Sequence, residues 1–160
     1  MAQPVPTGFR SVTPHLTVRG AAQAIDFYRK AFGAEELNRM ASPDGSSIWN
    51  ATIRIGDSVL MLNDEFPEQK SLSPLAHGGT AVTIHLYVDD ADAVHRRAVE
   101  AGATSTMAVE DTFWGDRYGT VRDPFGHAWA IATHKEDPTP EQMYQRVEAM
   151  MKGAGKSCPE

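Results

Sequence analysis

The stretch VTPHLTV at residues 12–18 returns as VTIHLYV at residues 82–88, with a histidine at the centre of each copy. Apolar and polar residues alternate along these segments, a pattern typical of a strand that is buried on one face. Similarity between distant segments of one chain indicates a duplicated structural unit. We therefore expect the residues that follow the two copies to share one order of secondary structure.

The residues after the first copy change from strand to helix periodicity. In GAAQAIDFYRKAFG, residues 20–33, apolar side chains fall three or four positions apart, and Gly33 is suited to end the helix. Three short alternating segments follow at residues 34–41, 48–55 and 58–64. The motifs SPDG and GD between them favour tight hairpin turns. The first unit is therefore predicted to be βαβββ.

The second copy is followed by the same order of elements. Residues 89–103 carry an aspartate cap and an apolar stripe that ends at Gly102, which indicates a helix. The strands expected after this helix cover residues 103–110, 117–123 and 127–134. The last two are joined by DPFG, in which the proline fixes φ for a tight turn and the glycine closes it.

The chain is thus predicted to be one α+β domain over residues 10–136, built from tandem βαβββ modules at residues 12–65 and 82–134. Residues 66–81, rich in Pro, Ser and Gly, are either a linker or a lid. A final helix is expected over residues 138–152, because its first residues are Thr, Pro and Gln at positions that cap a helix.

Composition restricts the classes of partner. With 160 residues and 41% hydrophobic content, the chain is long enough for one buried core. A formal charge of −6 argues against nucleic acid and anionic membranes and suits a small or cationic ligand. The single cysteine, Cys158, cannot form an intrachain disulfide. The first residues, MAQPVPTGFR, lack an apolar core of signal-peptide length, and no apolar run is long enough to span a membrane. We expect a soluble, cytoplasmic protein.

Three sequence segments resemble those of a known family: AIDFYRKAFGAE, HLYVDDADAVHRRAVEAGA and YGTVRDPFGHAWAIATH. With the two βαβββ units, they resemble the vicinal oxygen chelate superfamily, which includes glyoxalase I, bleomycin-resistance proteins and extradiol dioxygenases. Within it, the chain is most similar to the PhnB-like group. The resemblance covers residues 10–136 and implies that the sheets of the two modules form a cup around a shared cavity.

The resemblance also implies where the repeated histidines lie. His15 and His85 would occupy equivalent positions and face one another across the cavity or the seam between modules. The alternative is that both imidazoles are packed, hydrogen-bonded core residues. Members of the superfamily commonly form dimers, so a homodimer is expected. The methionine-rich face of residues 143–151 would either serve such an interface or cover a sheet.

A metal site is not expected from the resemblance. The positions that hold metal ligands in metal-using members are occupied by residues without a suitable imidazole or carboxylate, namely Thr13, Met61, Thr83 and Ala130. We therefore predict no metal and no cofactor. An alternative is that His15 and His85, two positions further along and on the same strand face, act as an unorthodox ligand pair with Asn63.

The segment TFWGDRYG at residues 112–119 is the best remaining functional stretch. In similar bleomycin-resistance-like proteins such a segment lies near the cavity, so Trp114 and Tyr118 would stack on a ligand and Arg117 would pair with a carboxylate. Alternatively, Trp114 packs the rim of the cup and Arg117 forms a structural ion pair with Asp111 or Asp116, the acidic residues nearest to it.

Two functions from different classes remain open. In the first, a metal-free protein binds a small organic molecule, such as a drug or toxic metabolite, in an aromatic-lined cavity, as in antibiotic-resistance relatives. The ligand-binding residues would then be His15, Trp49, His85, Trp114 and Arg117, although for Trp49 the structural alternative, covering a sheet edge, is slightly favoured. In the second, His15 and His85 transfer protons in a glyoxalase-like lyase or isomerase, with or without a non-standard metal site.

Overall fold

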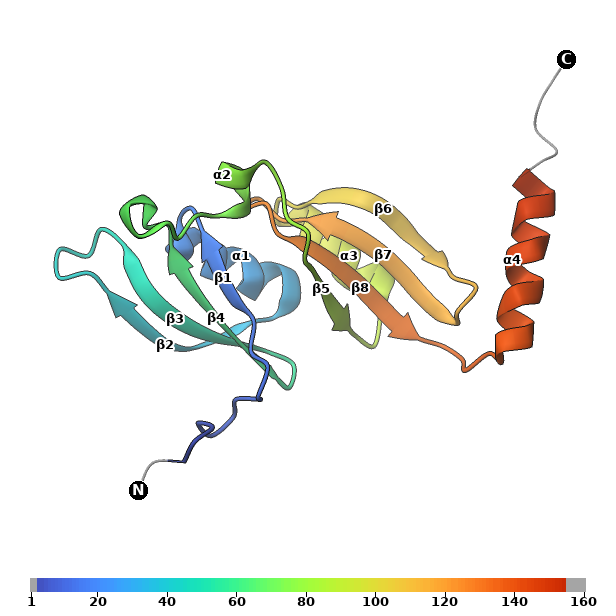
Figure 1. Cartoon of the computed structure of the whole chain (residues 1–160), viewed down its shortest axis with the longest axis horizontal. Coiled ribbons are helices and arrows are strands. Elements are labelled where there is room, and N and C mark those ends of the chain that lie inside the picture. Colours follow the sequence, from blue (N-terminus) through green and yellow to red (C-terminus); the bar gives the residue numbers. More distant parts are fainter. Residues whose placement is uncertain (1–2, 155–160) are drawn as a thin grey trace, which may run out of the picture.

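Two four-stranded sheets with the same strand order form the body of the protein, whose computed structural model describes residues 3–154 (Figure 1). The first unit contains β1 (His15–Val18), α1 (Ala21–Phe32), β2 (Glu35–Ala41), β3 (Ile48–Ile55) and β4 (Ser58–Asp64). The second contains β5 (Thr83–Tyr87), α3 (Ala91–Glu100), β6 (Thr104–Asp111), β7 (Asp116–Arg122) and β8 (Ala128–His134). The strand orders are β1-β4-β3-β2 and β5-β8-β7-β6. The predicted α+β fold of tandem βαβββ modules is confirmed.

The repeated histidines lie on equivalent strands. Each module places its first strand at a sheet edge, parallel to its last strand, with His15 opposite Met61 and His85 opposite Ala130. β1 is shorter than the repeated motif, because Pro14 has no N–H to donate to a ladder. The carbonyl of Pro14 still accepts from the Met61 N–H at 2.9 Å, which keeps the chain beside β4.

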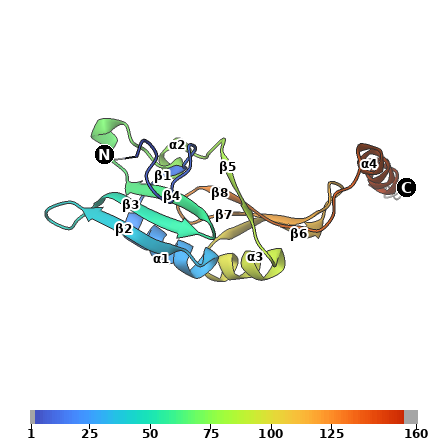
Figure 2. The same cartoon turned by 90° about the horizontal axis from the view of Figure 1, so that it is seen from below.

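The helices of the two modules lie next to each other on the same side of both sheets (Figure 2). The Arg97 side chain of α3 donates to the carbonyl of Ala31 in α1 at 2.9 Å and joins them. Each helix is capped by the last strand of its own sheet. Asp64 accepts from the Ala21 N–H at 2.7 Å, and Thr133 accepts from the Ala91 N–H at 2.8 Å.

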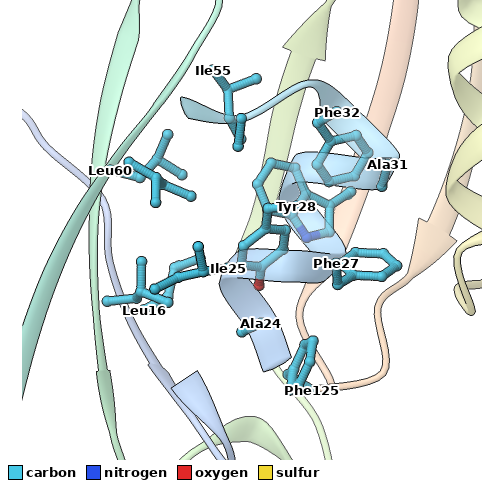
Figure 3. Packing of buried hydrophobic residues seen from close by; sticks show 14 of the residues in the cluster. Leu16, Ala24, Ile25, Phe27, Tyr28, Ala31, Phe32, Ile55, Leu60 and Phe125 are labelled. Carbon is cyan, nitrogen blue, oxygen red and sulfur yellow. The ribbon is translucent and has the colours of Figure 1, made fainter. Parts of the chain in front are cut away.

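Aromatic side chains of α1 bind the two modules into one core (Figure 3). Tyr28 is fully buried, and its ring lies 5.4 Å from the ring of Trp129 in β8. The Phe32 ring lies 4.5 Å from that of Trp129. Asp123, in the turn before β8, accepts from the Tyr28 hydroxyl at 2.8 Å and from the Trp129 indole at 2.9 Å. The first helix thus packs against the second sheet as well as its own.

The segment between the modules is ordered by a carboxylate. It contains a 3₁₀ turn, η1 (Pro67–Gln69), and a short helix, α2 (Pro74–His77). Glu65 accepts from the Ser73 N–H at 2.9 Å and from the Ser73 hydroxyl, and its other oxygen pairs with Arg19 at 2.9 Å. Hydrogen bonds from Arg19 and then from Ser73 lower the pKa of Glu65 to about 2.

The last helix, α4 (Pro140–Ala154), extends away from both sheets (Figures 1 and 2). Its start has the predicted capping arrangement, because the Thr139 N–H donates to Gln142 Oε1 at 2.8 Å and the Gln142 N–H donates to Thr139 Oγ1 at 3.3 Å. Within residues 3–154, no helix combines the length and apolar character needed to span a membrane.

Candidate functional site

The second sheet has one face covered by helices and one face free of them. Side chains alternate along β8, so buried Trp129 and Ile131 point toward the helices. The opposite side we term the helix-free face. Strand pairing places on it the following side chains: His85, Tyr87, Asp116, Tyr118, Thr120, Ala130, Ala132 and His134.

Aromatic rings form a continuous series on the helix-free face, here named the aromatic row: Phe113, Trp114, Tyr118, His85 and Tyr87. Successive ring centroids lie 5.0, 5.4, 5.8 and 4.6 Å apart along this series. All of these separations fall within the range of interacting aromatic pairs, about 4.5–7 Å. The protein therefore presents a group of interacting rings on one side of the second sheet.

Small residues of the central strand allow the rings to meet. β8 lies between β5 and β7, which places those two strands roughly 10 Å apart. Yet the rings of His85 on β5 and Tyr118 on β7 approach to 5.8 Å. The β8 residues opposite them are Ala130 and Ala132, whose methyl groups leave room for both rings to lean inward. A larger side chain at either alanine would separate the rings.

One buried carboxylate orients several members of this surface. Asp116 is 4% exposed and accepts from the Trp114 indole at 3.0 Å and from the Tyr87 hydroxyl at 3.4 Å. Its other oxygen lies 2.8 Å from Nδ1 of His134. The negative charge of Asp116 raises the pKa of Tyr87, and its hydrogen bond raises the pKa of His134. Asp116 thus fixes side chains from three separate segments.

A cavity of about 540 Å³ opens at the seam between the modules, near β1 and β5. Its wall is largely apolar but includes the imidazoles of His15, His85 and His127. His127 also lies 3.0 Å through Nε2 from the carbonyl of Thr17. His85 belongs both to this seam cavity and to the aromatic row. In residues 3–154, the structure has no group of three or more His, Cys, Asp or Glu side chains that could hold a metal ion.

The structure brings some of the predicted ligand-binding residues together and separates others. His15 and His85 line the seam cavity, and Trp114 lies in the aromatic row that meets it at His85. Trp49 is 44% exposed and lies in β3 of the first sheet, at a bulge where Met40 pairs with Asn50 and Ala41 with Ile48.

Arg117 lies on the helix side of the second sheet. Its guanidinium donates to Asp92 of α3 at 2.6 and 2.8 Å and to Asp111 at 3.3 Å. Hydrogen bonds to Asp92, and then to Asp111, raise the pKa of Arg117 further. The ion pair proposed as the structural alternative is therefore present with Asp111, with Asp92 as the stronger partner. A role of Arg117 or Trp49 in ligand binding stays a prediction.

Several residues of this surface were absent from the predicted set. Tyr87 follows His85 at the two-residue strand period, and Asp116 precedes Tyr118 by the same spacing. Strand alternation alone would have grouped each pair on one face. The sequence contained no comparable signal for the contact of His127 with Thr17 or of His134 with Asp116, because these partners come from distant segments.

A family model, the Glyoxalase/Bleomycin resistance protein/Dioxygenase superfamily, matches residues 10–131. An uncharacterized protein of Mycobacterium bovis is 49% identical over 148 residues, which cover 91% of this chain and 94% of that protein. The PhnB-like subgroup stays a prediction.

Solved structures agree in fold. The crystal structure of an Arabidopsis thaliana gene product is 30% identical, with a TM-score of 0.61 over 78% of this chain and 98% of that chain. TioX from Micromonospora is 25% identical, with a TM-score of 0.60 over 81% of this chain and 100% of that chain.

Proposed function

Because this chain belongs to the glyoxalase/bleomycin resistance protein/dioxygenase superfamily, we propose that it binds a small organic molecule on the aromatic row without using a metal ion. The observation that carries the proposal is the contact of the His85 and Tyr118 rings across the small residues of β8. The rings cover Ala130 and Ala132 of β8 and pair across strands, yet His85 and Tyr87 stay exposed and Trp114 and Tyr118 are only partly buried. A planar ligand would gain a preformed stacking surface.

The chemistry of the face favours a planar ligand with polar edges. Trp114 and Tyr118 offer ring faces, while Tyr87 and His134 place polar groups around Asp116, which also accepts from Trp114. Each stacking contact contributes about 0.5–1.5 kcal/mol beyond surface burial. Two such contacts and a buried ligand surface are compatible with micromolar binding, about −8 kcal/mol. A drug or toxic metabolite of this shape is the ligand class we propose.

Metal independence is supported by the residue types at the positions that hold the ligands in metal-using relatives. In metal-using relatives, the ligands come from positions that are here occupied by Thr13, Met61, Thr83 and Ala130. None of these side chains is a strong donor for a divalent metal ion. We expect elemental analysis of protein purified without chelator to find no stoichiometric zinc, iron, nickel or manganese. Stoichiometric metal would contradict this part of the proposal.

We further propose that the protein acts as a cytoplasmic homodimer. In a single chain the aromatic row is open on one side, and Tyr87 is 61% exposed. A second copy facing the row would complete a cup around the ligand. The single cysteine, which leaves no possibility of an intrachain disulfide, suits a reducing compartment.

A second candidate function is proton transfer by a glyoxalase-like lyase or isomerase. The observation that favours it is the seam cavity, whose wall contains three imidazoles, those of His15, His85 and His127. Imidazole exchanges protons near neutral pH and can act as a general acid or base. If this function holds, a bound ligand is converted, and replacing His15 or His85 by Gln abolishes turnover without abolishing ligand binding.

The binding proposal is tested by a thermal-shift screen of planar aromatic compounds, followed by titration of variants. We expect Trp114→Ala and Tyr118→Ala to weaken binding about twofold to tenfold each, the equivalent of one stacking contact. Trp49→Ala is the matched control, because it removes an exposed indole from the other sheet. If the Trp114→Ala and Tyr118→Ala proteins are folded and bind like the parent, the ligand site lies elsewhere.

A further inference from the structure

A second, smaller cavity adjoins the seam cavity on the side of the N-terminal segment. It has a volume of about 170 Å³ and is lined by Arg10, by the end of β3 and the start of β4, and by β5. Val12, Pro14, Ile84 and His85 line both cavities, so the two spaces meet at these residues. A ligand whose body occupies the larger space can therefore direct one end past His85 toward Arg10.

The wall of the seam cavity is aliphatic rather than aromatic. Apart from its imidazoles, the apolar lining consists of Val12, Pro14, Leu16, Val82 and Ile84. Val12 and Val82, which occupy equivalent positions in the repeated motif, are 87% and 68% exposed. A volume of about 540 Å³ lies within the range of small-molecule pockets, about 300–1,000 Å³. Such a wall gains free energy by burying an aliphatic chain and offers no ring face for stacking.

The ionisable side chains around this space are all basic. In the part of the chain that the structure describes, the two cavities are lined by Arg10 and by the imidazoles of His15, His85 and His127, and by no Asp or Glu. Composition does not explain this, because the chain has 21 acidic residues and 15 Lys and Arg. The cavity beside the β6–β7 turn, by contrast, includes three carboxylates. The seam therefore favours a negatively charged ligand group over a positive one.

Arg10 is placed to receive such a group. Its side chain is exposed, and within residues 3–154 it forms no ion pair. Its carbonyl accepts from the Thr13 hydroxyl at 2.9 Å, which fixes the local turn of the segment beside the cavity. Arg117, which the sequence predicted to pair with a carboxylate, is already held by Asp92 and Asp111. A guanidinium binds a carboxylate through two parallel N–H donors, so Arg10 suits a carboxylate ligand.

We propose that the seam binds an aliphatic carboxylate, with its chain along the aliphatic wall and its carboxylate paired with Arg10. His85 lies where the two spaces meet, and its ring can donate a hydrogen bond to the acid group in either protonation state. Such a ligand needs no aromatic ring. The inference therefore goes beyond the proposed planar ligand, and it depends neither on stacking on the aromatic row nor on proton transfer by the histidines.

Calorimetric titration of the full chain with octanoate, hexanoate and octan-1-ol tests the ligand class. We expect octanoate to bind about tenfold more tightly than hexanoate, because two further CH₂ groups are buried. Octan-1-ol has the same chain length without the charge and should bind at least about threefold more weakly than octanoate. Equal affinity for octanoate and hexanoate would overturn the aliphatic site, and octan-1-ol binding as tightly as octanoate would overturn the carboxylate site.

Two pairs of variants locate the site at exposed positions, where folding is expected to be preserved. Arg10→Gln should weaken octanoate binding about threefold to tenfold and leave octan-1-ol binding unchanged. Its control is Arg96→Gln, which replaces an exposed arginine of α3 and should change neither. Val12→Asp adds a negative charge to the wall and should weaken octanoate binding more than Val12→Asn, a neutral side chain of the same shape.

The outcome separates this site from the aromatic row. If folded Arg10→Gln and Val12→Asp proteins bind octanoate like the parent, the carboxylate does not lie in the seam and the inference is overturned. Because octanoate has no ring, that result leaves the proposed planar ligand untouched. Conversely, failure of every planar compound to bind would refute stacking on the aromatic row while octanoate binding at the seam persists.

Discussion

Replacing Asp123 by Ala is expected to destabilise the protein strongly, because this carboxylate joins the modules through buried donors. It accepts from the Tyr28 hydroxyl and the Trp129 indole, and those residues are 0% and 1% exposed. It also accepts from the N–H groups of Phe125 and His127, both at 2.9 Å. Burial, and then the charge of Asp123, raises the pKa of Tyr28, so the hydroxyl remains a donor.

The magnitude follows from the donors that the substitution leaves without an acceptor. A buried donor without a partner costs about 1–3 kcal/mol, so the two side chains alone cost about 2–6 kcal/mol. This is a large part of the 5–15 kcal/mol that is typical of a domain. Asp123→Asn is expected to cost less, about 1–3 kcal/mol. Its amide oxygen still accepts, and the Tyr28 hydroxyl can rotate to accept, but the Trp129 indole cannot.

Urea unfolding with linear extrapolation measures these differences. The matched control is Asp57→Ala, because Asp57 is exposed in the corresponding turn of the first module, and among residues 3–154 its side chain accepts a hydrogen bond only from the adjacent Ser58. We expect the control to change the free energy of unfolding by less than about 0.5 kcal/mol. If Asp123→Ala costs no more than Asp57→Ala, the modules are not joined through this carboxylate and the reasoning fails.

Two predictions concern pH. The pKa of His134 is raised from 6.5 by Asp116, so its stabilising contribution is complete below pH 6.5 and is lost as pH rises through the raised value. NMR titration of His134 in Asp116→Asn should show a lower pKa than in the parent; an unchanged value would exclude Asp116 as the cause. Glu65, with its pKa lowered from 4.5 to about 2, stabilises the protein above pH 4.5, and this contribution is lost as pH falls through about 2. Acid unfolding of Glu65→Gln should therefore depend less on pH in this window than that of the exposed control Glu68→Gln, and identical profiles would refute the assignment.

Much of the fold is predictable because local patterns and tertiary structure agree. The two-residue period predicted β3 and β4 at their observed bounds, residues 48–55 and 58–64. The helix period placed α1 and its end at Gly33, whose φ of 69° suits glycine. The repeated motif correctly indicated a duplicated module. In these segments the type of each residue depends mainly on whether its side chain faces the core or the solvent.

The candidate site was less predictable because it depends on which face the helices cover. The motif TFWGDRYG was interpreted as one functional cluster, yet neighbouring strand residues point to opposite faces. Tyr118 thus lies in the aromatic row while Arg117 pairs with Asp92 of α3. The cap of α1 was not predicted for a related reason. Asp64, which accepts from the first N–H of α1, lies in a strand that is distant in sequence.

The central claim is that a planar ligand stacks on the aromatic row, and the indole N–H signals test it most directly. The chain has three tryptophans, Trp49, Trp114 and Trp129, of which Trp129 is buried in the core and Trp49 lies on a different sheet. When ¹⁵N-labelled protein is titrated with a ligand from the thermal-shift screen, the Trp114 indole signal should shift in a saturable manner while the other two remain nearly unchanged. A shift of the Trp49 signal with an unmoved Trp114 signal would contradict the account.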